Sequence, residues 1–215
     1  DLHEDLSDYD FYGVGRDDGT QRGEHAPIFY SKERLELLDS GTFWLSPTQE
    51  KVGSKGWDAA ITRIASWVKL KDKATGAAFY AINTHFDHRG SQARAESAKL
   101  LVERLNEQFA DHPVVLTGDF NTLPDSAPYQ TLTTGTEERP AFREAHSNSA
   151  KQPSGPSSTW NGFTKIVPNR RIDFIFVNDQ REVLRHRNRH DQSDGKDPSE
   201  HLPVVTKLRT KRGER

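Results

Sequence analysis

The 215-residue sequence predicts an α/β fold of the α+β type, in which mixed β-sheets pack against helices. Three observations predict it: several short apolar and β-branched segments, one long amphipathic helix, and the order in which these segments follow one another. That order is a hairpin, a helix, a strand, a helix, a loop and two further strands. It differs from the regular alternation of strand and helix that is typical of a parallel sheet.

The N-terminal half contains the predicted hairpin. Short apolar runs at Ala26–Tyr30 and Phe43–Leu45 are typical of strands. The segments Ile61–Leu70 and Ala77–Asn83 are apolar and β-branched, and residues 71–76 between them are polar and end in a glycine. This pattern predicts two antiparallel strands joined by a turn.

The predicted helices follow the hairpin. From Ser91 to Phe109, apolar residues recur at helical spacing with charges between them, which predicts an amphipathic helix. A short helix is expected at Tyr129–Leu132. Residues 146–158 are rich in Ser, Pro and Gly and predict a surface loop. The remaining apolar segments predict three strands, Val114–Thr117, Ile172–Val177 and Leu202–Leu208.

Composition excludes several classes of function. The chain contains no cysteine, so disulfides, thiolate nucleophiles and cysteine metal sites are excluded. Mean hydropathy is −0.86, and no apolar run approaches the length of a membrane span. The net charge of −2 gives no overall basic footprint for nucleic acid. The length fits one large domain or two small ones.

A carboxylate and an amide follow the apolar strand at Val114–Thr117. Asp119 and Asn121 stand two residues apart in the motif Gly-Asp-Phe-Asn. Side chains two apart on an extended segment point to the same side. An acid and an amide so placed can hold a hard divalent cation together with a phosphate oxygen. The motif therefore indicates a metal-assisted phosphoester hydrolase.

Two histidines end the hairpin strand in the segment Asn83–His88. We expect His85 to donate a proton or hydrogen bond to a phosphate oxygen and His88 to lie beside it. Polar clusters at strand ends are frequent positions of functional sites. The structural alternative, in which such a histidine only caps the strand, stays open.

Asp173 is an acidic residue inside an apolar strand, so it needs a partner if it is buried. His201, before the last strand, is the favoured partner, because an aspartate that orients a histidine creates a general base near neutral pH. A pairing with Arg170 or Arg171 is the alternative. Glu200, next to His201, is a second carboxylate within reach of a metal ion.

Two loops combine aromatic and polar or basic residues. Trp57 follows the loop residues 53–56, and with Arg63 it can clamp a phosphate and stack on a base or ring. Trp160 and Asn161 repeat this combination in a later turn, and the aromatics there have no evident core position. We interpret all four as candidate substrate contacts, against the alternative that these segments are ordinary loops.

Four motifs in this order resemble those of the endonuclease/exonuclease/phosphatase superfamily, which has the deoxyribonuclease I-like fold. They are Asn83–His85, Gly118–Asn121, Arg171–Phe176 and Ser199-x-His201-x-Pro203. Longer blocks resemble its bacterial branch of metal-dependent hydrolases, at residues 13–19, 23–30, 54–58 and 83–90. The resemblance implies a four-layer sandwich of two mixed β-sheets flanked by helices, with residues 1–215 forming one domain.

The resemblance also implies roles for five residues. Asp119 is similar to the carboxylate that orients or activates the attacking water, and Asn121 to the amide that holds the phosphate and the water. His201 matches the histidine that faces the scissile phosphorus, and Asp173 matches its carboxylate partner. His85 matches the histidine that donates to a phosphate oxygen or to the leaving group.

The sequence departs from the family pattern at two places. The family triplet Ser-Asp-His is Ser-Glu-His here, and the longer Glu200 is expected to bind metal with a shifted geometry. The family's main metal-binding glutamate, in a Gln-Glu pair, and an asparagine on the first strand are expected to precede Asp1. We therefore expect an N-terminally incomplete domain that lacks the first strands of one sheet, with residues 1–8 forming the end of a helix.

The resemblance implies a Mg²⁺- or Mn²⁺-dependent phosphoesterase that uses an activated water. Asp119 and Glu200 are the predicted metal ligands in this chain. The first hypothesis is hydrolysis of phosphodiester bonds in a nucleic-acid end, a nucleotide or another small phosphodiester. Two alternatives stay open: a non-catalytic module that binds a phosphate ligand or a partner, and a phosphomonoesterase of inositol or sugar phosphates. The sequence does not determine the compartment or the oligomeric state.

Overall fold

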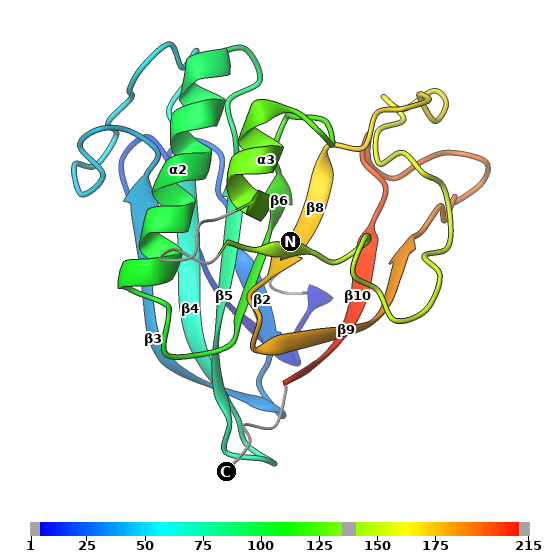
Figure 1. The fold of residues 1–215 in the computed structure, drawn as a ribbon, viewed down its shortest axis with the longest axis horizontal. Coiled ribbons are helices and arrows are strands. Elements are labelled where there is room, and N and C mark those ends of the chain that lie inside the picture. Colours follow the sequence, from blue (N-terminus) through cyan, green and yellow to red (C-terminus); the bar gives the residue numbers. More distant parts are fainter. Residues whose placement is uncertain (1–4, 135–140, 211–215) are drawn as a thin grey trace.

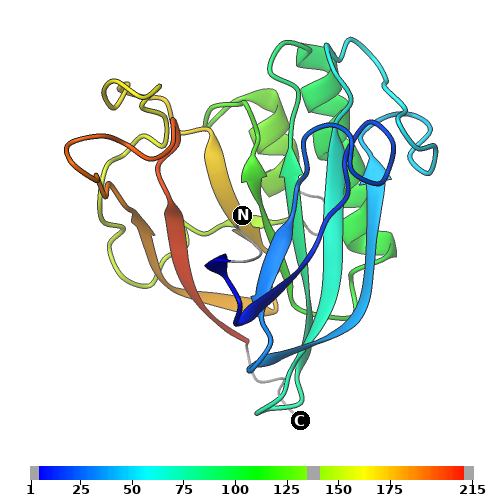
Figure 2. The ribbon, with the colours of Figure 1, turned by 180° about the vertical axis from the view of Figure 1, so that it is seen from behind.

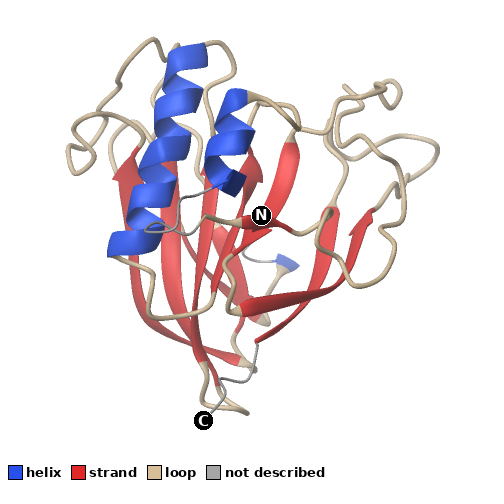
Figure 3. Cartoon of the chain, in the orientation of Figure 1, coloured by secondary structure: helices blue, strands red, loops and turns tan. Residues whose placement is uncertain are grey.

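The computed structural model describes residues 5–134 and 141–210 and has the predicted α/β fold, with one mixed sheet, two antiparallel sheets and few helices in the described part (Figures 1 and 3). Its centre is a six-stranded sheet in the order β3-β4-β5-β6-β8-β7. Within this sheet β5 and β6 are parallel and the other neighbours are antiparallel. The strands are β3 (Leu35–Trp44), β4 (Ile64–Asp72), β5 (Ala78–His85), β6 (Val114–Asp119), β7 (Arg143–Glu144) and β8 (Asp173–Val177).

Helices α2 (Ser91–Glu107) and α3 (Ala127–Thr134) cover one face of this sheet (Figure 1). The residues that predict α2 by their spacing, such as Leu101 and Leu105, are the ones it buries. Asp58 caps its N-terminus from a distant loop, since its carboxylate accepts hydrogen bonds from the N–H groups of Gln92 (3.2 Å) and Ala93 (2.7 Å). No helix in the described ranges is long and apolar enough to cross a membrane.

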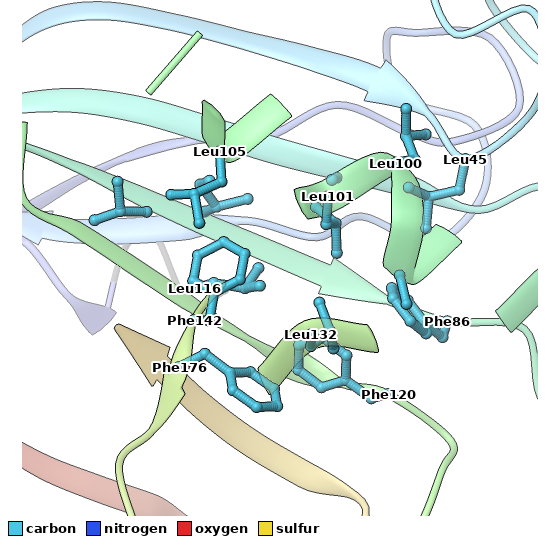
Figure 4. Packing of buried hydrophobic residues seen from close by; sticks show 14 of the residues in the cluster. Leu45, Phe86, Leu100, Leu101, Leu105, Leu116, Phe120, Leu132, Phe142 and Phe176 are labelled. Atoms are coloured by element: carbon cyan, nitrogen blue, oxygen red, sulfur yellow. The ribbon is translucent and has the colours of Figure 1, made fainter. Parts of the chain in front are cut away.

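Leucine and phenylalanine side chains together fill the core between the helices and the sheet (Figure 4). Phe120 is fully buried there, with its ring centroid 4.9 Å from that of Phe86 and 5.1 Å from that of Phe176. Such edge-to-face contacts fix the orientation of each ring. Because Phe120 is anchored in this way, the two polar residues on either side of it, Asp119 and Asn121, have fixed backbone positions.

Two smaller antiparallel sheets lie on the other face (Figure 2). One pairs β1 (Tyr9–Tyr12) with β2 (Ile28–Ser31), and the other pairs β9 (Arg181–Asn188) with β10 (Val204–Thr210). The first packs on β4 through Tyr30, and the second packs on β8 through Val183. The loops that follow β1 and precede β10 thereby reach the end of the main sheet where β5 and β6 terminate.

Several elements differ from the prediction. β3 begins at Leu35, whereas the sequence predicts a strand only from Phe43. The first half of β3 pairs with β4 from Leu35 onward, but it is mostly exposed and has no apolar alternation, so the sequence pattern does not indicate it. β9 is absent from the prediction, since three of the side chains it buries are polar, namely Arg181, His186 and Asn188. The two-residue β7 has no sequence signal. Of the helix expected over residues 1–8, residues 1–4 lie outside the described residues, and a helical position at residue 5 is followed by a turn.

Candidate active site

Three polar side chains stand in a row across the end of the main sheet. β5 ends at His85, β6 ends at Asp119, and β8 begins at Asp173. The register pairs His85 with Asp119 in the parallel ladder and Asp119 with Asp173 in the antiparallel one. Residues 34 or more positions apart in the sequence therefore become neighbours because of strand pairing alone.

The Gly-Asp-Phe-Asn motif forms a tight turn at the end of β6. Gly118 has φ 156°, and a Cβ there would lie 2.1 Å from the Thr84 carbonyl oxygen, so the close pairing with β5 requires glycine. Asn121 has φ 45°, and its backbone N–H donates to Asp119 Oδ1 at 2.8 Å. The expectation of an extended segment through Asn121 is therefore wrong. A left-handed turn, and not a strand, brings the amide to the side of the carboxylate.

Asp173 is paired with His201. His201 Nδ1 donates to Asp173 Oδ2 at 2.8 Å, and the alternative partner Arg171 instead forms an ion pair with Glu144. Burial raises the pKa of Asp173, and the hydrogen bond from His201 offsets this only in part. Burial opposes the charge on His201, but the hydrogen bond and the charge of Asp173 outweigh it and raise the pKa of the imidazole. The ring is thus held with Nε2 facing the site.

His85 is held by a second carboxylate, Glu24. His85 Nδ1 donates to Glu24 Oε1 at 2.9 Å, and the other oxygen of Glu24 pairs with Arg16. This hydrogen bond lowers the pKa of Glu24 to about 2, although burial works against it. Burial also opposes the charge on His85, but its hydrogen bonds with Asp119 and Glu24 raise the pKa of the imidazole. Asn121 Nδ2 lies 3.1 Å from His85 Nε2.

The two histidines converge on one oxygen. Asp119 Oδ2 lies 3.2 Å from His85 Nε2 and 3.8 Å from His201 Nε2. We refer to Glu24 with His85 and to Asp173 with His201 as the two dyads. In each dyad the carboxylate fixes the imidazole through Nδ1 and leaves Nε2 toward Asp119. This arrangement can orient a water molecule and exchange protons on both sides of it.

A divalent cation is the cofactor that this donor set fits. Ligand atoms of Asp119, Asp173 and His201 lie within 4.8 Å of one another, and carboxylate oxygens with an imidazole suit Mg²⁺ or Mn²⁺. One of the three, Asp173, is already engaged by His201. Glu200, the other predicted ligand, is not in this group. Its carbonyl oxygen accepts hydrogen bonds from the N–H groups of Asn161 (2.8 Å) and Gly162 (3.2 Å).

Open space adjoins Asp119 on the sheet face opposite the helices. A cavity of about 290 Å³ is lined there by Asn83, Thr117, Asp119 and Asp173, among others. Since Mg²⁺ keeps several waters when it binds to few carboxylates, this volume is compatible with a partly hydrated ion at Asp119.

Arg63 and His88 lie behind the Glu24 dyad. Arg63 is only 4% exposed, its Nη2 donates to His88 Nδ1 at 3.2 Å, and its Nη1 is 3.7 Å from Glu24 Oε2. Burial lowers the pKa of Arg63, while the charges of Glu24 and Asp87 support the cation. Arg63 therefore supports Glu24 from a buried position, whereas the sequence predicts that it clamps a phosphate directly. His88 is exposed beside Arg63, and a contact of His88 with substrate stays a prediction.

The aromatic residues predicted to bind substrate fall into two groups. Trp160 lies against His201, with ring centroids 4.8 Å apart and the rings nearly perpendicular. Trp57 precedes the helix-capping Asp58, and among the described residues no hydrogen bond or ring contact joins it to the dyads or to Asp119. Asn161 is fully buried and both its amide atoms bind protein groups, and its contact with substrate stays a prediction.

Glu24 is the functional candidate that the sequence does not single out. It lies 61 positions before His85, in a loop between β1 and β2, so no local spacing links the two residues. Its place in the Gly-Glu pair at the start of the block 23–30 is the only signal that could have found it.

Comparison with known proteins supports a common fold and family. Residues 2–201 match the model of the Endonuclease/Exonuclease/phosphatase family. An endonuclease/exonuclease/phosphatase from Bacteroides vulgatus is 42% identical with a TM-score of 0.91, and the match covers 98% of this chain and 79% of that chain. Mannosyl-6-phosphatase of Bacteroides thetaiotaomicron VPI-5482 is 36% identical with a TM-score of 0.88, covering 96% of this chain and 79% of that one.

A more distant relative is the protein named Protein angel of Drosophila melanogaster. It is 30% identical over 113 residues, which is 52% of this chain. The matched part spans 31% of the length of that protein.

Proposed function

The chain belongs to the endonuclease/exonuclease/phosphatase family, and from this premise we propose that it is a divalent-metal-dependent hydrolase that cleaves phosphoester bonds with water. One observation carries the proposal. Two histidines, each fixed by its own carboxylate, have Nε2 within 4 Å of the same oxygen of Asp119, at 3.2 Å for His85 and 3.8 Å for His201. A group on each side of a reacting phosphorus is what an in-line displacement by water requires.

On one side, Asp119 orients the attacking water and His201 receives its proton at Nε2. Asp173 holds the Nδ1–H of His201 at 2.8 Å, which fixes the tautomer in which Nε2 is the acceptor. The raised pKa makes that nitrogen a stronger base. The water oxygen then forms its bond to phosphorus.

On the other side, His85 protonates the leaving oxygen through Nε2 as its bond to phosphorus breaks. Glu24 accepts the Nδ1–H at 2.9 Å and favours the protonated ring. Asn121 Nδ2 is 3.1 Å from the same Nε2, so its amide lies where it can donate to a phosphoryl oxygen. Its backbone turn fixes that position.

A Mg²⁺ or Mn²⁺ ion bound at Asp119 supplies charge stabilisation for the phosphoryl group. A phosphodiester remains the substrate that the sequence predicts. A sugar phosphate monoester is the second candidate, because the 36% identical protein of B. thetaiotaomicron is named a mannosyl-6-phosphatase. Both classes present the same phosphoryl centre to the dyads.

The test is a hydrolysis assay with Mg²⁺ or Mn²⁺ on three substrates: bis-p-nitrophenyl phosphate, p-nitrophenyl phosphate and mannose 6-phosphate. We expect release of product that stops with a chelator and returns with either metal. The matched variants are Asp119→Asn, which we expect to be inactive, and Asp39→Asn on the distant strand β3, which we expect to retain activity.

The ratio of rates on the diester and monoesters decides the substrate class. A wild-type protein without metal-dependent activity on any of the three would favour the non-catalytic module instead. Activity that survives Asp119→Asn would contradict the proposed site at Asp119.

A further inference from the structure

Phe163 is an apolar side chain in an unusual position. It is 63% exposed, the most exposed large apolar residue in the described part of the chain. Its backbone φ is 60°, in the left-handed region that bulky residues rarely adopt. An exposed aromatic ring on a strained backbone contributes nothing to the core, and the strain persists only where surrounding contacts hold it.

Asn161 holds Phe163 in this conformation. It is fully buried, and its Oδ1 accepts a hydrogen bond from the Phe163 N–H at 2.6 Å. Its Nδ2 donates to the Ser199 carbonyl at 2.9 Å. Its own carbonyl accepts from the N–H groups of Thr164 (3.2 Å) and Lys165 (3.1 Å). One buried residue therefore sets the shape of the whole turn.

The same turn is attached to the loop that carries His201. The N–H groups of Asn161 and Gly162 donate to the Glu200 carbonyl, and Trp160 packs on the His201 ring. Gly162 in turn lies against the indole of Trp160, since a Cβ there would be 3.3 Å from Nε1. The turn lies at the end of the sheet where β8 begins (Figure 1). Phe163 is thus held at the rim of the site.

We propose that Phe163 is a specificity-determining residue that packs on a ring in the alcohol part of the phosphoester substrate. This inference rests on the proposed function, because it concerns the group that leaves from the phosphorus. Aromatic rings pack well on the apolar face of a sugar and on planar aromatic rings. Asn161 acts as a positioning residue, since it contacts Phe163 and not the substrate.

A purely structural role fits Phe163 less well. A core role is excluded by the exposure of the ring. A simple loop tip would be served better by a glycine or asparagine, which adopt the left-handed conformation with less strain. A phenylalanine at this position exposes apolar surface on a strained backbone, and a contact with another molecule would bury that surface.

The experiment measures kcat and KM for wild type and Phe163→Ala on three monoesters. Mannose 6-phosphate carries a sugar ring, p-nitrophenyl phosphate an aromatic ring, and glycerol 3-phosphate no ring. We expect Phe163→Ala to lower kcat/KM about tenfold for a ring-bearing substrate, mainly through KM, and to leave glycerol 3-phosphate unchanged. Phe163→Trp should restore the preference. A loss confined to the sugar or to the nitrophenyl ester identifies the kind of ring.

Leu38→Ala, which removes an apolar side chain of 44% exposure from β3, is the matched control. It should leave kcat/KM unchanged for substrates with and without a ring. Equal values for wild type and Phe163→Ala, or an equal loss on all three esters, would overturn the inference and leave the proposed function standing. A wild-type protein that hydrolyses none of the three and is inactive on the diester would overturn the proposed function and this inference with it.

Discussion

The two dyads hold a histidine in the same way but are built differently. Asp173 belongs to the central sheet, and its side chain is 18% exposed. Glu24 comes from a loop, and its side chain is 48% exposed. Burial raises the pKa of Asp173, whereas the hydrogen bond from His85, helped by the charges of Arg16 and Arg63, lowers that of Glu24.

This difference indicates how each dyad tolerates change. In the Asp173 dyad, strand pairing fixes Asp173 and an isolated bridge with Trp160 holds His201, and water cannot replace a lost contact easily. In the Glu24 dyad, the carboxylate is held by two arginines, and solvent reaches it. We therefore expect the Asp173 dyad to be sensitive to any substitution and the Glu24 dyad to tolerate a conservative one.

The largest effect is expected for Asp173→Asn. The amide keeps the shape but lacks the negative charge that favours the protonated ring. Its NH2 group can donate to Nδ1, which leaves His201 in the tautomer whose Nε2 carries the proton and cannot act as the base. We predict a decrease in kcat of about 10³-fold with little change in KM, measured by steady-state kinetics on the best substrate.

The matched control is Asp72→Asn, a carboxylate of 15% exposure at the far end of β4. It should keep its kcat. A loss in kcat below about tenfold for Asp173→Asn would mean that the histidine does not depend on its buried partner.

The second effect concerns stability. Arg63→Met removes a buried cation that lies between Glu24 and Asp87 while it retains most of the side-chain volume. Because Asp87 keeps hydrogen bonds from four backbone N–H groups, the cost is smaller than for a fully orphaned charge. We predict a decrease of about 2 kcal/mol in the free energy of unfolding, measured by urea denaturation. An unchanged midpoint would contradict a supporting role for Arg63.

A smaller effect is expected for Glu24→Gln. Water and the contact of His85 with Asp119 partly compensate for the lost carboxylate of Glu24. We therefore predict a decrease in kcat of about tenfold. Glu36→Gln removes an equally exposed carboxylate (49%) from β3 and serves as the control. A decrease in kcat for Glu24→Gln as large as that for Asp173→Asn would show that exposure of the carboxylate does not distinguish the two dyads.

The smallest effect concerns a histidine without a carboxylate hydrogen bond. His186 Nδ1 lies 3.0 Å from the Thr206 hydroxyl, and burial, with the nearby His146, lowers its pKa below the ordinary value of 6.5. As pH falls below about 6.5, the unfolded chain takes up a proton before the folded one, so stability decreases in that range. His186→Gln should flatten the pH dependence of unfolding between about pH 7 and pH 5, measured by thermal denaturation. An unchanged curve would contradict the lowered pKa.

The sequence predicts those parts of the site that follow from local patterns or from burial. The apolar run before Asp119 predicts β6, and the cost of a buried carboxylate predicts that Asp173 needs a histidine partner, which the structure contains at 2.8 Å. The four ordered motifs indicate the family, which the comparisons confirm. The roles of the individual residues stay predictions.

The remaining parts could not be predicted because they depend on tertiary contacts. Glu24 reaches His85 only after β1 and β2 pack on the main sheet, and a loop glutamate carries no signal of that contact. The basic and aromatic residues near Arg63 in the sequence predict an exposed phosphate clamp, but the fold buries the Arg63 side chain. β9 buries polar side chains such as His186, so the alternation by which strands are predicted is absent.

The most direct test of the two-dyad site is a double-mutant cycle on kcat with Asp173→Asn and His201→Gln. If the two residues act as one unit, the double variant will be no slower than His201→Gln alone, because the carboxylate acts only through the imidazole. If the two losses multiply instead, Asp173 and His201 contribute independently, and the assignment of a dyad at Asp119 is contradicted.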